Sequence, residues 1–277
     1  MVQPMHVSGF RFATPVHAVL GALLLTACSP NGPRPASGRL GLGLADSALA
    51  GGAPTLALQV SKAVLQRNPN DVPAMLRRGD AYLQLGDAPR AAASYRQALI
   101  LQPRSVPALM GLGRVALASD PAEAGARFSE ALAVDPANQA ALSDRGVSLD
   151  LSGLHAEAQT DYRRAIALGN ADAARGLDDG AENGALAATE VDLAVSLAIS
   201  GQPSEAVRIL QPIAASPDAT PRVRQDLAMA LSLDNRPDEA AHLLLTQMSQ
   251  DQARSAMAGY QALRPDAPAT PAGTDGS

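Results

Sequence analysis

Small residues recur along the chain at a spacing that predicts pairs of packed helices. The first set is Gly79, Ala91, Ala98 and Pro103, at offsets 0, 12, 19 and 24. The same order follows in two further sets: Gly113, Ala124, Ala131 and Pro136, then Gly146, Ala158 and Ala165. Small side chains let two antiparallel helices approach closely, and a proline ends the second helix of a pair. A period near 34 residues therefore predicts an all-α array of helix-turn-helix units.

Extending this period along the chain predicts six helix pairs and a C-terminal capping helix. The pairs cover 39–71, 72–105, 106–138, 139–172, 187–220 and 221–254, and the capping helix runs from Ser255 to Leu263. Residues 173–186 break the period with three glycines and several acids, so we expect a loop or a short irregular helix there. The repeat domain thus covers 39–264. Residues 29–38 are predicted to be a flexible tether and 265–277 a disordered tail, because both are rich in proline.

The first 28 residues have the pattern of a targeting segment. Val16 to Thr26 is apolar apart from His17 and is too short to span a bilayer. The sequence Leu25-Thr26-Ala27-Cys28 resembles a bacterial lipobox, which implies lipidation of Cys28. By the same resemblance, Ser29 implies an outer-membrane destination facing the periplasm. An ordinary signal peptide that happens to contain cysteine is the alternative. Since Cys28 is the only cysteine in the chain, we expect no internal disulfide.

Composition and candidate chemistry argue against catalysis. The chain is 47% hydrophobic but only 3% aromatic, which suits thin layers of Ala, Leu and Val between stacked helices. Its net charge of −5 argues against a nucleic-acid partner. Beyond the targeting segment, His155 has Gln159 four residues later and His242 has Asp238 four residues earlier, but neither makes a cluster of metal ligands. No nucleophile or phosphate-loop motif occurs. We therefore expect no enzyme activity, no cofactor, no metal and no small-molecule substrate. An enzyme or a metal carrier is the competing class, and measurement of bound metal would test it.

Residues 72–105 resemble the tetratricopeptide repeat. The matching residues are Gly79, Tyr82, Gly86, Ala91, Tyr95, Ala98 and Pro103. Phe128 and Tyr162 occupy the same position as Tyr95, where we expect a ring to fill the core between helix pairs and not to bind a ligand. Arg78 stands where the family has leucine, so we expect either looser packing or an arginine that reaches the surface.

The resemblance implies that the first helix of each pair lines a concave groove that binds an extended peptide or a helix of a partner protein. Simple solvated helix faces are the other interpretation of these positions. The candidate groove residues are Leu76, Arg77, Asp80, Leu83, Met110, Arg114, Leu117, Ser143, Val147 and Asp150.

A second resemblance covers roughly residues 140–265. Ala219 to Gln225, with the sequence ATPRVRQ, is similar to the C-terminal part of the tetratricopeptide-repeat lipoprotein of the tight-adherence (Tad/Flp) pilus assembly system, although Asp226 replaces an asparagine of that family. The resemblance implies a scaffold at the outer membrane that binds a secretin or another pilus-assembly subunit and aids secretin assembly. The alternative is an adaptor for barrel assembly, polysaccharide export or cell-wall hydrolases, and the neighbouring genes would separate the two.

Overall fold

The computed structural model describes residues 37–175 and 181–263, and the residues in these ranges form thirteen α-helices. The six pairs are α1 (Ser37–Ala50) and α2 (Pro54–Arg67), α3 (Val72–Gln84) and α4 (Ala88–Leu101), α5 (Val106–Ala116) and α6 (Pro121–Val134), α7 (Gln139–Leu151) and α8 (His155–Ala174), α9 (Ala181–Ile199) and α10 (Pro203–Ala215), and α11 (Pro221–Leu233) and α12 (Pro237–Leu245). Helix α13 (Gln250–Ala262) follows them. This order confirms the predicted all-α array. Cys28, the targeting segment and the tail from residue 265 lie outside the described residues.

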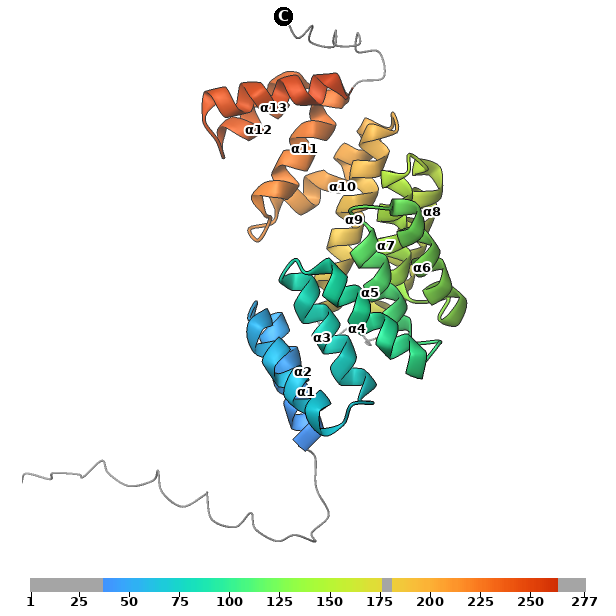
Figure 1. Cartoon of the computed structure of the whole chain (residues 1–277). Coiled ribbons are helices and arrows are strands. Elements are labelled where there is room, and N and C mark those ends of the chain that lie inside the picture. The colour runs from blue at the N-terminus through green and yellow to red at the C-terminus, as the bar shows by residue number, and fades with distance from the viewer. Residues whose placement is uncertain (1–36, 176–180, 264–277) are drawn as a thin grey trace, which may run out of the picture.

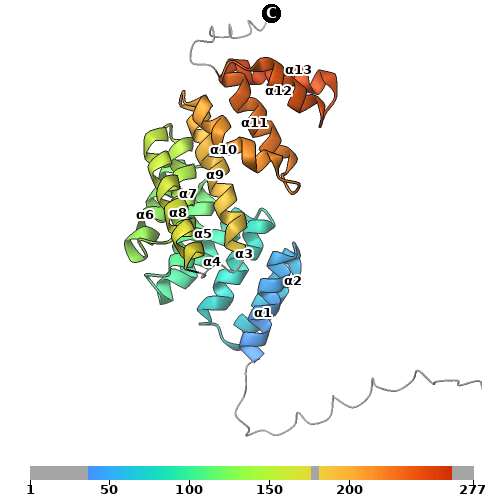
Figure 2. The same cartoon turned by 180° about the vertical axis from the view of Figure 1, so that it is seen from behind.

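The helices stack in chain order into an open arc, with α1 and α2 at one end and α12 and α13 at the other (Figure 1). Each helix packs on the next along the chain. Contacts that skip one helix join the odd-numbered helices, as in α1–α3, α3–α5, α7–α9, α9–α11 and α11–α13. The odd-numbered helices therefore lie closer together than the even-numbered ones and form the inner, concave face. The view from behind shows α6 and α8 on the outer side of the same arc (Figure 2).

The turn inside each pair explains the period of the sequence. Backbone φ is positive at Gly52, Gly86, Gly153, Gly201 and Asn235, each of which follows the first helix of its pair. Glycine adopts this conformation without strain, and asparagine tolerates it better than most residues. The third pair has one residue fewer and turns without such a residue. Aspartates at some of the turns then cap the next helix: the side chain of Asp87, for example, accepts the backbone N–H of Arg90.

Buried rings join successive pairs, as the sequence predicts. Tyr95, Phe128 and Tyr162 are at most 1% exposed. A Cβ added at Gly79 or at Gly111 would lie 2.5 Å from the ring of Tyr95. Glycine at these points lets α3 and α5 sit directly against the ring, so the ring position belongs to the core.

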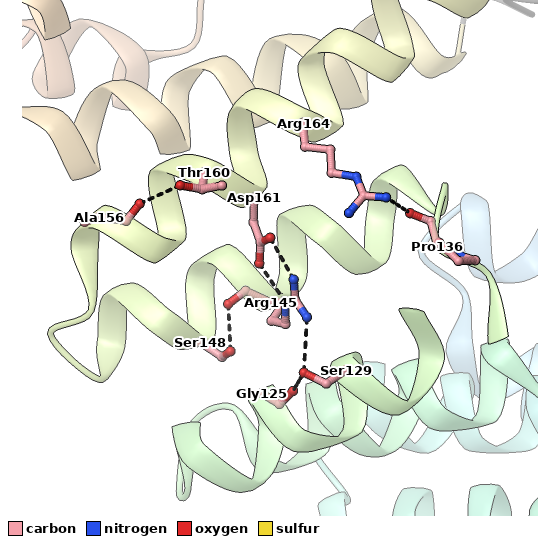
Figure 3. Close-up of polar contacts among 9 residues, drawn as sticks. All are labelled: Gly125, Ser129, Pro136, Arg145, Ser148, Ala156, Thr160, Asp161 and Arg164. Carbon is pink, nitrogen blue, oxygen red and sulfur yellow. Dashed lines mark hydrogen bonds and ion pairs between the residues drawn. The ribbon is translucent and has the colours of Figure 1, made fainter. Parts of the chain in front are cut away.

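Arginines at the predicted leucine position do not loosen the packing. Arg78 donates to Ser94 Oγ at 3.0 Å and to Gln97 Oε1 at 2.7 Å, which ties α3 to α4. Figure 3 shows the equivalent Arg145 in the fourth pair, where two nitrogens contact the carboxylate of Asp161 at 2.7 and 2.8 Å. Asp161 is 6% exposed, so this bidentate pair is largely shielded from solvent. Both arginines therefore hold the two helices of their own pair together.

Two predicted boundaries differ in the structure. Helix α8 continues to Ala174 and α9 already begins at Ala181, so 173–174 and 181–186 belong to two long helices where a loop or a short irregular helix was expected. Packing explains the early start of α9, because Leu186 lies against Gly169 of α8 and Thr189 hydrogen-bonds Ser143 of α7. Tertiary contact here outweighs the helix-breaking tendency of glycine.

The capping helix α13 begins at Gln250, five residues before its predicted start. Ser249 and Gln252 form a reciprocal capping box, in which each side chain accepts the backbone N–H of the other residue. This cap starts a new helix within the predicted sixth pair, and α12 is correspondingly short.

Candidate protein-binding site

Ion pairs cross the inner face between neighbouring helix pairs. Arg77 on α3 contacts Asp46 on α1, with Nε and Oδ1 2.7 Å apart. Arg114 on α5 contacts Asp144 on α7, also at 2.7 Å. The Asp46 carboxylate raises the pKa of Arg77, and burial raises the pKa of Asp144 in spite of its partner. The predicted groove residues Arg77 and Arg114 thus pair their charges within the protein.

The apolar groove residues predicted on α3 and α5 are largely in the core. Leu76 and Met110 are each 7% exposed, which corrects their predicted position on an open surface. Leu83 and Leu117 are partly buried against the same core. The inner helices pack too closely here to leave these side chains free, so the inner face of the second and third pairs offers little apolar surface to a partner.

Two tyrosines on the outer helices α4 and α8 hydrogen-bond carboxylates that were predicted to line the groove. Tyr95 Oη donates to Asp80 at 2.7 Å, and Tyr162 Oη donates to Asp150 at 3.0 Å. Asp150 Oδ1 also accepts from Ser196 Oγ at 2.7 Å and lies 2.8 Å from His155 Nδ1. Asp150 therefore has its hydrogen-bonding capacity largely met before any ligand arrives.

A cavity of about 900 Å³ opens on the inner face between α7, α9 and α11. The segment between α10 and α11 closes one side of it. Two of the predicted groove residues, Val147 and Asp150, contribute to its wall, and Ser143 lies nearby under Thr189. The apolar part of the wall includes Val147, Leu151, Val191, Val195, Ile199, Ile213 and Val223. The charged part consists of Asp150, Asp192, Asp218, Asp226 and Arg222.

Two carboxylates of this wall are electrostatically unusual. Burial raises the pKa of Asp192 to about 6, and the carboxylates of Asp150, Asp226 and Asp144 contribute to the rise, while Arg222 opposes it. Burial also raises the pKa of Asp226. The Oδ2 atom of Asp226 is buried and has no hydrogen-bond partner among the described residues. An unpaired buried carboxylate is costly, which makes this wall a strong candidate for contact with a ligand.

Sequence reasoning missed the α9 and α11 side of the cavity. The groove positions were assigned only in the second to fourth pairs, where the repeat is most regular. The turn residues Gly201 and Asn235 carry the same period forward and would have placed Val191, Val195 and Asp226 on the inner helices. The period was therefore sufficient to identify the inner helices of the last two pairs, but it does not predict the shape of the cavity.

The described residues include no group of three or more His, Cys, Asp or Glu side chains that could hold a metal ion. Across the described ranges, every helix is too short or too polar to cross a membrane. A second cavity of about 550 Å³ lies between α10, α11 and α12, with His242, Arg236 and Glu239 in its wall. Charged side chains of its wall pair with each other, as Arg236 does with Glu239 at 2.7 Å, so the first cavity is the better candidate site.

Comparison with known proteins agrees with the repeat pattern. Residues 76–119 and 118–173 match the family model described as tetratricopeptide repeat. The FK506-binding protein-like protein of Mus musculus is 36% identical over 102 residues, which is 37% of this chain and 29% of that relative. The chain therefore covers well under half of this curated relative.

Solved structures with the same fold include a type IV pilus biogenesis factor. The chain is similar to PilW, a widely conserved type IV pilus biogenesis factor, with 20% identity, a TM-score of 0.63 and coverage of 80% of this chain and 100% of that one. It is similar to pilF of Pseudomonas aeruginosa, with 16% identity, a TM-score of 0.63 and coverage of 81% and 96%. A tetratricopeptide-repeat protein of Thermus thermophilus, TTC0263, gives 21% identity, a TM-score of 0.58 and coverage of 70% and 99%. At these identities the likeness shows the fold.

Proposed function

Taking this chain as a tetratricopeptide-repeat protein, we propose that it is a non-enzymatic scaffold which binds a partner protein during assembly of a tight-adherence pilus. The observation that carries the proposal is the composition of the α7–α9–α11 cavity. Ala219, Thr220, Arg222 and Val223 line it, and all four belong to the ATPRVRQ segment that resembles the pilus lipoprotein. The segment that suggests the pilus system is thus part of the candidate binding surface.

The shape of the cavity favours a peptide or helix of a partner over a small substrate. At about 900 Å³ it is near the upper end of the range for small-molecule sites, and it opens onto a concave face built from several helices. Apolar side chains on three helices can accept an amphipathic segment, which is a common mode of peptide recognition. The shared fold of PilW, a type IV pilus biogenesis factor, supports a role in pilus biogenesis by analogy.

We further propose that Cys28 carries a lipid that holds the scaffold at the periplasmic face of the outer membrane. A tethered scaffold raises the local concentration of its partner without any turnover. The partner in this proposal is a secretin or another subunit of the pilus machine.

Deletion of the gene tests the function directly. We expect fewer secretin multimers and fewer surface pili, both restored by the wild-type gene. Unchanged secretin multimers together with unchanged pili would exclude the proposal. Cys28→Ala tests the anchor: we expect the variant to leave the outer-membrane fraction for the soluble periplasm, and a variant that stays in the membrane would exclude lipidation at this residue.

A further inference from the structure

The ion pairs of the inner face follow one rule of position. Each inner helix carries a buried small residue at its closest crossing, such as Ala45 on α1 or Gly113 on α5. In two places, the residue after this small residue pairs with the residue two before the equivalent small residue on the next inner helix. Asp46 and Arg77 form one such pair between α1 and α3, and Arg114 and Asp144 form another between α5 and α7.

This pairing is absent between α3 and α5, where the two positions hold Asp80 and Gly111, and it is also absent in the C-terminal half of the array. The crossing residues of α9 and α11 are Ala194 and Ala228, so the positions two before them hold Asp192 and Asp226. The positions that should supply their partners hold valine, namely Val147 on α7 and Val195 on α9. Both carboxylates therefore face the inner side without the arginine that contacts Asp46 and Asp144.

No other group in the described part of the chain replaces the missing partners. Within those ranges, neither Asp192 nor the buried Oδ2 of Asp226 has a hydrogen bond, and neither residue is in an ion pair. The positive charge of Arg222 lowers the pKa of both carboxylates, but Arg222 forms no ion pair with a described residue. Of the charged residues that line the cavity in the described part of the chain, four are acids and one is a base. The cavity is thus an apolar site with excess negative charge.

We propose that the α7–α9–α11 cavity binds a partner segment in which a lysine or arginine is flanked by apolar side chains. The cation takes the place of the missing arginine beside Asp192 and Asp226, and the apolar neighbours contact Val191, Val195 and Val223. A partly buried carboxylate without a partner is costly, and a well-placed cation offsets that cost. The inference rests on the proposed function only in taking the ligand to be a protein.

Leu151 supports the apolar part of this assignment. It lies at the wall of the cavity and is 59% exposed, although its side chain is large and hydrophobic. An exposed leucine beside a partly buried apolar surface gives a flanking side chain of the ligand a place to pack. A segment with a cation alone would leave this part of the site uncovered.

Selection of peptides tests the proposal without knowledge of the natural partner. The purified full chain is used to select from a random dodecapeptide library on phage, and the selected peptides are then titrated against three proteins. These are the wild type, the double variant Asp192→Asn/Asp226→Asn and the control Asp251→Asn, which changes an exposed carboxylate on α13. Circular dichroism establishes that all three fold alike.

We expect selected peptides to carry Lys or Arg between apolar residues, and to bind the double variant at least tenfold more weakly while binding the control as they bind the wild type. Peptides without basic enrichment, an empty selection, or equal affinity for the double variant would each overturn the inference. Neutral peptides combined with a pilus defect on deletion would remove this inference and leave the proposed function. Selection of cationic peptides without any pilus defect on deletion would remove the proposed pilus function and leave this inference.

Discussion

Replacement of Asp192 by asparagine should stabilise the protein at neutral pH. In the folded chain the pKa of Asp192 rises from 3.8 to about 6, because burial disfavours the charged carboxylate. Each pKa unit corresponds to about 1.4 kcal/mol, so the ionised side chain costs the folded state roughly 3 kcal/mol at pH 7. Asparagine has nearly the same shape and no charge. We therefore expect Asp192→Asn to raise the free energy of unfolding by up to about 3 kcal/mol at pH 7.

The sign of the pH dependence follows from the raised pKa. The folded state binds a proton at Asp192 as the pH falls through about 6, whereas the unfolded state binds it only near 3.8. The wild type therefore gains stability from this group between pH 6 and pH 4, and the asparagine variant does not. The advantage of the variant should shrink to near zero at pH 4.

Urea unfolding at pH 7 and at pH 4 measures this difference. The chain has no tryptophan, so helix content followed by circular dichroism is the suitable signal. Asp251→Asn serves as the control: Asp251 is exposed, and loss of its ion pair with Arg254 should change the free energy of unfolding by less than about 1 kcal/mol at both values of pH. A variant no more stable than the wild type at pH 7, or an equal gain at both pH values, would refute the reasoning.

Two further predictions concern packing. Gly111→Ala places a methyl group 2.5 Å from the ring of Tyr95 and should lower the free energy of unfolding in urea by about 1–3 kcal/mol. The control Gly43→Ala has open space around it and should be neutral or stabilise by up to about 1 kcal/mol, so equal effects of the two variants would contradict the close packing of Gly111 on Tyr95. Arg145→Met should cost about 3–5 kcal/mol because it leaves the buried Asp161 unpaired, and Arg145→Met/Asp161→Leu should recover most of that loss; a double variant as unstable as the single one would show that the pair is not the cause.

The sequence was sufficient for most of the helices and the core. A period of small residues places the turns, and the ring position is recognisable because Gly79 and Gly113 repeat beside it. Each of these features depends on a local spacing that the chain displays directly. The start of α9 is an exception, because contacts of Leu186 and Thr189 with the fourth pair decide the structure there.

The candidate site was less predictable because it depends on pairing between repeats. Asp46 and Arg77 are 31 residues apart, and Arg114 and Asp144 are 30 apart. The interruption at 173–186 separates Val147 from its equivalent partner Asp192 by a longer stretch of chain, so the missing pair is not visible as a period. The cavity itself depends on how α9 and α11 are placed, which no local pattern specifies.

Crosslinking inside living cells tests the central claim most directly. A photoreactive amino acid at Leu151, in the wall of the cavity, is compared with the same group at Ile100, which is 78% exposed on α4 and does not line the cavity. We predict that position 151 crosslinks to a secretin or another pilus-assembly subunit and that position 100 does not. Equal crosslinking of that subunit at both positions, or crosslinking at position 100 alone, would contradict the claim that this cavity is the binding site.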